Sequence, residues 1–136
     1  MADKVKIAKA FLVAERKVKF AYLFGSLAAG TAGPLSDLDL AVYLDGRLDL
    51  FKSRLQLMEA LARELKTENF DLVVLNVAPI VLKHEVISNG IVLKDDRLRR
   101  VTFESRALRE YLDTAYLRQV QLGYLREQIK RGDFFG

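Results

Sequence analysis

The sequence contains no cysteine and only one histidine among its 136 residues. Without cysteine, the chain cannot form a disulfide scaffold, a cysteine-ligated zinc site or a cysteine nucleophile. The single histidine, His84, has no second histidine or cysteine with which to bind zinc. We expect it at the surface or at the boundary of the core, and we expect no zinc or thiol chemistry.

Long apolar runs are also absent. No run approaches the ~18 residues that a membrane span requires, and the N-terminal stretch MADKVKIAKAFLVAERK lacks the uninterrupted apolar core of a signal peptide. We therefore expect a cytoplasmic protein without membrane contact. Hydrophobic residues make up 51% of the chain, which is enough for one domain with a real core.

Hydrophobic periodicity predicts eight elements in the order α-β-β-α-β-α-β-α. The predicted helices are 3–16, 49–66, 80–88 and 95–131, and the predicted strands are 18–24, 38–44, 70–77 and 91–94. Strand 70–77 is almost continuously hydrophobic, which favours a central position in the sheet. The pattern predicts an α/β (α+β) fold in which helices pack on a small mixed sheet of about four strands, followed by a long C-terminal helix.

The net charge of +4 is unevenly distributed. Residues 1–20 hold six Lys/Arg against two acids, and residues 94–131 hold ten against six. Basic segments suit polyanionic partners, but these arginines alternate with acids and do not cluster with aromatic residues. We expect solvated helix surfaces and no direct nucleic-acid binding. Arg47, Lys52 and Arg54, near the exit of strand 38–44, are weak candidates for phosphate contact.

Two aspartates lie in or directly before the apolar strand 38–44. Because strand side chains alternate, Asp37 and Asp39 leave the same side while Leu38 and Leu40 leave the other. Two carboxylates this close repel each other unless a cation lies between them, and Mg²⁺ prefers such hard oxygen ligands. The pair alone does not establish a metal site, because one aspartate could cap a helix while the other faces solvent.

The segment upstream of the aspartates is rich in small residues. Gly25 and Ser26 end the preceding strand, and small residues continue to Gly30. Exposed N–H groups at a strand-to-helix turn, with a serine hydroxyl, form a cradle for phosphate. The segment is not a P-loop, because Thr31 stands where the lysine is required, and the Gly-x-Gly-x-x-Gly fingerprint is absent.

Gly25-Ser26, ten intervening residues and Asp37-x-Asp39 together resemble the signature of the polymerase-β-like nucleotidyltransferases. They are most similar to the pattern Gly-Ser-x10-Asp-x-Asp of the minimal nucleotidyltransferase (MNT) family. The agreement extends beyond the motif, since a helix precedes the Gly-Ser strand and a third acid, Asp71, opens a later strand. A short helix that ends in glycine and a further strand follow, as in that family.

The resemblance covers roughly residues 3–95 and implies a nucleotidyltransferase fold. We expect a nucleotidyltransferase core over residues 1–95, with residues 96–136 as a helical extension of the same single domain. The ten residues between the two parts of the motif would be the connection that lays the triphosphate over the metal ions.

The resemblance also implies roles for five residues. Gly25 and Ser26 would bind the triphosphate of ATP, and Asp37 and Asp39 would hold two Mg²⁺ ions that bridge the phosphates. Asp71 would be the third carboxylate, either as a metal ligand or as the acceptor of the proton from the attacking hydroxyl. The residues themselves leave open that Asp71 only satisfies a neighbouring backbone N–H.

Family members that resemble this chain act as antitoxins, which pair with a HEPN-domain ribonuclease toxin and adenylylate one of its tyrosines. The resemblance therefore implies Mg²⁺-dependent transfer of AMP from ATP to a HEPN toxin. Two alternatives remain open: transfer to a small molecule such as an aminoglycoside, and a non-catalytic antitoxin that masks its partner by binding.

The C-terminal helix has two apolar stripes. The first, which we expect to pack on the domain, consists of Leu108, Leu112, Ala115, Leu122 and Ile129. The second consists of Tyr116, Val120 and Tyr124 at i, i+4 and i+8. A helix that is apolar on more than one side suggests a partner face or a homo-oligomer formed through this helix. The alternative is a helix that folds back and buries both stripes.

Overall fold

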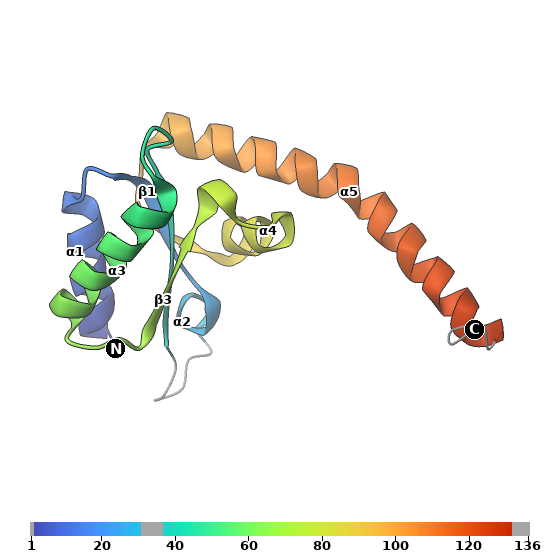
Figure 1. Cartoon of the computed structure of the whole chain (residues 1–136), viewed down its shortest axis with the longest axis horizontal. Coiled ribbons are helices and arrows are strands. Elements are labelled where there is room, and N and C mark those ends of the chain that lie inside the picture. Colours follow the sequence, from blue (N-terminus) through green and yellow to red (C-terminus); the bar gives the residue numbers. More distant parts are fainter. Residues whose placement is uncertain (1, 31–36, 132–136) are drawn as a thin grey trace.

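A four-stranded mixed sheet with helices on both faces forms the body of the protein (Figure 1). The structure is a computed structural model, and it describes residues 2–30 and 37–131. Its elements are α1 (Ala2–Ala14), β1 (Val18–Phe24), α2 (Gly25–Ala29), β2 (Leu38–Leu44), α3 (Leu50–Leu65), β3 (Phe70–Val74), a 3₁₀ turn η1 (Leu75–Val77), α4 (Ile80–Asn89), β4 (Ile91–Lys94) and α5 (Arg97–Arg131). The predicted α/β (α+β) class, with a small mixed sheet and a long C-terminal helix, is confirmed.

The strand order is β3-β2-β1-β4. β1 pairs antiparallel with both β2 and β4, whereas β2 and β3 are parallel. The register places Phe24 at the end of β1 opposite Asp39, and it places Asp39 beside Asp71 of β3. The end of β1 and the starts of β2 and β3 therefore meet at one end of the sheet.

The predicted central position of strand 70–77 is wrong, because β3 lies at an edge and ends at Val74. Its hydrophobicity has another cause: Leu72 and Val74 pack into the core on one face of the sheet, and Val73 packs on the other. β3 stops where the side-chain amide of Asn76 takes over the pairing with Leu44, donating to its carbonyl and accepting from its N–H at 2.9 Å each.

One face of the sheet is covered by α1 and α3. The alternating residues Leu38, Leu40 and Val42 of β2 are buried there. α3 adds an apolar stripe that includes Leu57 and Leu61. The N-terminus of α3 is fixed by Asp49, whose carboxylate accepts the N–H of Lys52 at 3.0 Å. The other residues of β2, among them Asp39, consequently belong to the opposite face.

The opposite face carries aromatic side chains beneath α4 and the start of α5. Phe20 stacks on Tyr43 with ring centroids 4.8 Å apart, and Phe103 of α5 packs against both rings. The buried Tyr22 hydroxyl donates a hydrogen bond to Glu104 of α5 at 2.5 Å. Burial and this carboxylate raise the pKa of Tyr22 above its ordinary value, so the hydroxyl remains a donor that ties α5 to β1.

The distal part of α5 extends away from the sheet and the other helices (Figure 1). The prediction that its first apolar stripe packs on the domain is wrong, since Leu112 is 61% exposed and Leu108, Leu122 and Ile129 are exposed as well. A 35-residue helix is about 52 Å long, whereas a seven-residue strand spans about 23 Å. The sheet can therefore cover only the first turns of α5.

His84 of α4 lies at the boundary of the core, as predicted. Its ring stacks on Tyr111 of α5 at a centroid distance of 3.6 Å, which is one of the contacts that hold α5 to α4. Within residues 2–30 and 37–131, no helix has both the length and the apolar character needed to cross a bilayer.

Candidate active site

Two of the predicted catalytic carboxylates lie side by side at one end of the sheet. Asp39 and Asp71 are register neighbours on the parallel strands β2 and β3, on the face opposite Leu38 and Leu40. Asp37 is exposed and immediately precedes β2, and it is close enough for its charge to act on Asp39. Strand pairing thus assembles carboxylates that are far apart in the sequence.

The neighbouring carboxylates oppose the ionisation of Asp39. Partial burial, and then the negative charges of Asp71 and Asp37, raise the pKa of Asp39. A divalent cation would relieve this repulsion, and three carboxylates supply the hard oxygen donors that Mg²⁺ prefers, so the donor set fits the metal. Within residues 2–30 and 37–131, no three acidic or histidine side chains are gathered closely enough to hold an ion. The two-Mg²⁺ arrangement stays a prediction.

Gly25 brings the backbone against Asp39. Its φ is +74°, in the left-handed region, and a Cβ built on Gly25 would collide with Oδ2 of Asp39. Only glycine satisfies both conditions without strain. Gly25 and Ser26 are the first two residues of α2, so the first turn of this short helix begins beside the carboxylate.

The phosphate-binding role of Gly25 and Ser26 remains a prediction. The N–H groups of a first helical turn have no partner within the helix and are suited to bind phosphate oxygens. Of the ten-residue connection expected to lay the triphosphate over the metals, residues 31–36 lie outside the described residues.

Asp71 does accept a hydrogen bond from a neighbouring backbone N–H, which the sequence had left as a possibility. Its Oδ1 accepts the N–H of Leu72 at 2.9 Å, while its side chain remains 59% exposed. An ionised carboxylate offers about four acceptor positions. This bond therefore orients Asp71 and leaves it able to bind a metal ion or receive a proton.

Arg54, which the sequence named only as a weak candidate for phosphate contact, lies beside a carboxylate of the candidate site. Its Nε donates to the Leu72 carbonyl at 2.9 Å, and its Nη2 lies 4.0 Å from Oδ1 of Asp71. Arg47, by contrast, pairs with Asp45 at 2.9 Å. The signal for Arg54 was its place near the start of the helix that connects β2 to β3, because such a helix packs over the two parallel strands it joins.

Comparison with known families agrees with this geometry. Residues 6–97 match the family described as Polymerase beta, Nucleotidyltransferase. The chain belongs to this family. It is a nucleotidyltransferase, as the Gly-Ser-x10-Asp-x-Asp spacing predicted. A comparison with curated proteins gives no match.

Solved structures of toxin–antitoxin complexes share the fold. A chain from a toxin–antitoxin crystal structure with AMP-PNP is 28% identical with a TM-score of 0.72, covering 91% of this chain and 97% of that chain. A chain from the toxin–antitoxin MntA–HepT is 27% identical with a TM-score of 0.68, covering 92% and 97%. In the complex of a tri-AMPylated Shewanella oneidensis HEPN toxin with its MNT antitoxin, the match is 24% identical with a TM-score of 0.69, covering 90% and 98%. The predicted resemblance to MNT antitoxins is confirmed.

Proposed function

We propose that this nucleotidyltransferase transfers AMP from ATP to a tyrosine hydroxyl of a HEPN-type ribonuclease toxin and thereby acts as its cytoplasmic antitoxin. The observation that carries the proposal is the register pair of Asp39 and Asp71, with Asp37 beside it and Gly25 against Asp39. The related complexes support the choice of nucleotide and acceptor, since one contains AMP-PNP and another a tri-AMPylated HEPN toxin.

In this reaction the tyrosine oxygen attacks the α-phosphorus of ATP. The new P–O bond forms as the bond to the bridging oxygen breaks, pyrophosphate leaves, and a carboxylate such as Asp71 receives the hydroxyl proton. Mg²⁺ held by Asp37, Asp39 and Asp71 would supply positive charge against the phosphates. The protein contributes mainly position: the turn at Gly25 would hold the triphosphate, and Arg54 lies 4.0 Å from Asp71.

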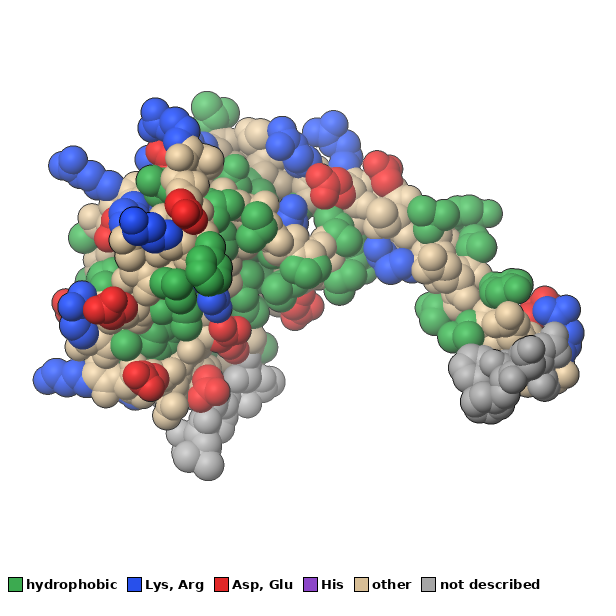
Figure 2. Space-filling model, viewed as in Figure 1, with side chains coloured by type: hydrophobic (Ala, Val, Ile, Leu, Met, Phe, Trp, Pro, Cys, Tyr) green, Lys and Arg blue, Asp and Glu red, His purple; other side chains and the backbone are tan. Residues whose placement is uncertain are grey.

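The toxin requires a docking surface, and the distal part of α5 offers one. Exposed apolar side chains gather on this segment (Figure 2). By the distal α5 face we mean the exposed apolar residues of this segment, which lie on more than one side of the helix: Leu112, Tyr116, Leu117, Val120, Leu122, Tyr124, Leu125 and Ile129. Apolar patches of this kind mark protein interfaces, in which tyrosine is enriched. We assign the toxin to this face, with a second copy of the chain as the competing occupant.

AMP transfer can be tested directly with purified proteins. The chain is incubated with α-labelled ATP, Mg²⁺ and a HEPN-type toxin, and the expected result is label on the toxin, mapped to a tyrosine by mass spectrometry. EDTA should prevent the reaction, because the carboxylates alone cannot neutralise the triphosphate.

Other results of this experiment distinguish the alternatives. Tight binding that neutralises the toxin without label on it would refute AMP transfer in favour of masking. Label on an aminoglycoside added in place of the toxin, with none on the toxin, would move the acceptor to a small molecule.

Removing apolar groups from the distal α5 face should weaken toxin binding. In the double variant Leu112→Ser/Tyr116→Ser, we expect affinity to fall by about thirtyfold, since buried aromatic anchors at interfaces contribute about 2 kcal/mol or more. Isothermal titration calorimetry measures the effect. The melting temperature should not change, because Leu112 and Tyr116 are 61% and 72% exposed.

The double variant Gln121→Ser/Gln128→Ser, on the side of the same segment opposite Leu112 and Tyr116, serves as the matched control and should bind normally. Unchanged toxin affinity in Leu112→Ser/Tyr116→Ser, together with loss of a homodimer in sedimentation, would assign the face to a second copy instead.

A further inference from the structure

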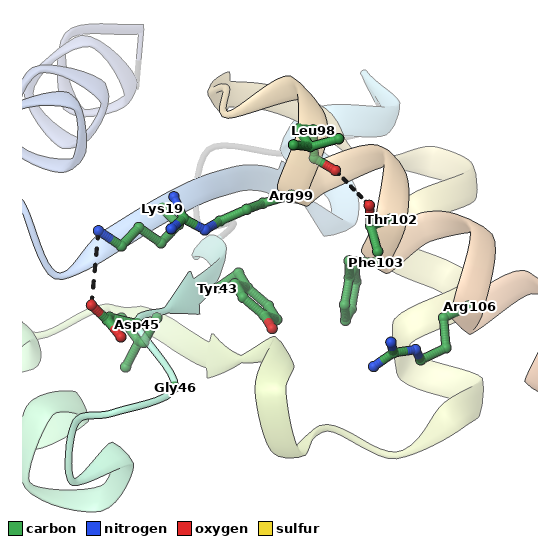
Figure 3. Close-up of a pocket in the computed structure, with 10 residues that line it drawn as sticks. Lys19, Tyr43, Asp45, Gly46, Leu98, Arg99, Thr102, Phe103 and Arg106 are labelled. Carbon is green, nitrogen blue, oxygen red and sulfur yellow. Dashed lines mark hydrogen bonds and ion pairs between the residues drawn. The ribbon is translucent and has the colours of Figure 1, made fainter.

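A second site lies at the opposite end of the sheet from the carboxylates. A cleft of about 280 Å³ opens between the start of β1, the end of β2 and the first turns of α5. Figure 3 shows the rings of Tyr43 and Phe103 in its middle, with Lys19 and Arg99 on one side of them and Arg106 on the other. Asp45 at the end of β2 is the acidic residue of the lining.

The α5 wall of the cleft follows helical spacing. Arg99, Phe103 and Arg106 stand at i, i+4 and i+7 and therefore share one face of the helix. Arg99 and Arg106 are about 10.5 Å apart along the helix axis. An aromatic ring thus lies between two guanidinium groups, and the first of them is in the opening turn of α5, where the helix dipole also favours an anion.

The cleft has an excess of positive charge. Asp45 is paired with Arg47 at 2.9 Å and with Lys19 at 4.0 Å, and Arg99 is paired with Asp96 at 2.6 Å. For Arg106 the described part of the chain gives no hydrogen bond or ion pair. Lys83, which lies 5.7 Å from the Phe103 ring centre, and Glu110 line the adjoining hollow with Arg106. An anion would therefore complete this site.

The cleft is distinct from the carboxylate site. Tyr43 is four residues along β2 from Asp39, a distance of about 13 Å on a strand. Both residues are on the same face of the sheet, which α4 also covers. A ligand in the cleft would therefore leave Asp37, Asp39 and Asp71 free.

We propose that this cleft binds a nucleoside phosphate, with the phosphate on Arg106 and the base against Tyr43 and Phe103. Aromatic rings and guanidinium groups are the usual contacts of a base and a phosphate. A single inorganic phosphate has no base to place against the aromatic rings, and it is too small to reach the cations on both sides of them. A long RNA would meet the carboxylates of Asp45, Asp96 and Glu110 at the margins of the cleft. The proposal is independent of AMP transfer to a toxin.

The binding test removes the carboxylate site first. In the Asp37→Ala/Asp39→Ala variant of the full chain with EDTA present, we expect AMP to bind measurably by isothermal titration calorimetry with one site per chain. Adding Arg106→Glu should weaken this binding at least tenfold, because a charge-assisted contact is replaced by repulsion. Arg109→Glu makes the same charge change on the same helix outside the cleft and should alter the affinity less than twofold.

Several outcomes would overturn the proposal. These are an absence of AMP binding in the Asp37→Ala/Asp39→Ala protein, equal loss in Arg106→Glu and Arg109→Glu, and inorganic phosphate binding as tightly as AMP. A hexaglutamate peptide that binds more tightly than AMP would assign the cleft to an acidic protein segment, and a single-stranded RNA that does so would assign it to RNA. Melting curves of Arg106→Glu and Arg109→Glu serve to check that both variants are folded.

Discussion

Asp39→Asn is expected to reduce nucleotidyl transfer by about 1,000-fold or more. The substitution removes the negative charge at the point where β1, β2 and β3 meet, and Asp39 has Asp71 as its register neighbour there. Metal-assisted charge stabilisation contributes several kcal/mol to such reactions, and each 1.4 kcal/mol is a factor of ten in rate. The measurement is the initial rate of AMP incorporation from labelled ATP at saturating Mg²⁺.

The same variant should be more stable than the parent protein without metal. Burial and the neighbouring carboxylates raise the pKa of Asp39 in the folded state, so the folded protein holds this charge less favourably than the unfolded chain does. The resulting destabilisation is absent below the ordinary pKa of 3.8 and develops as the pH rises through the folded-state pKa. At pH 7 in EDTA, Asp39→Asn should raise the melting temperature by about 2 °C or more.

Asp45, which directly follows β2, is a useful comparison because the same argument predicts the opposite effect on stability for it. Hydrogen bonds from Arg47 lower the pKa of Asp45, so its charge is favourable in the folded state and Asp45→Asn should not raise the melting temperature. An Asp39→Asn protein that melts lower than the parent and still transfers AMP would contradict both the electrostatic and the catalytic interpretation of Asp39.

Gly25→Ala is expected to lower both activity and stability. The left-handed φ of +74° disfavours alanine by about 1–2 kcal/mol, and the new methyl group would also displace the Asp39 carboxylate. Because the reacting groups require accurate position, we expect at least a hundredfold loss of AMP transfer. Melting temperature and initial rate are measured on the same preparation.

Gly30→Ala separates the two causes. Gly30 has almost the same φ, +73°, but a Cβ there would meet no atom within 4 Å among the described residues. Gly30→Ala should therefore introduce about as much backbone strain as Gly25→Ala, while it leaves the Asp39 carboxylate in place. If Gly30→Ala and Gly25→Ala lose activity equally, contact with Asp39 is not the reason for glycine at position 25.

The sequence by itself determined the order of eight elements, without the short helix α2 and the turn η1, and it named most residues of the candidate site. Alternation along β2 places Asp39 on one face and Leu38 and Leu40 on the other, because strand geometry has a period of two residues. The Gly-Ser-x10-Asp-x-Asp spacing predicted the family to which residues 6–97 belong. These features are local, since each depends on residues that are close together in the chain.

Only the tertiary structure decided which distant residues meet. A hydrophobic strand shows that its faces are covered but not which strands lie beside it, so the edge position of β3 and its register with Asp39 could not be derived from its composition. Arg54 reaches Asp71 because α3 packs over the strands that it connects. α5 leaves its apolar side chains exposed because it is longer than the sheet that could cover it.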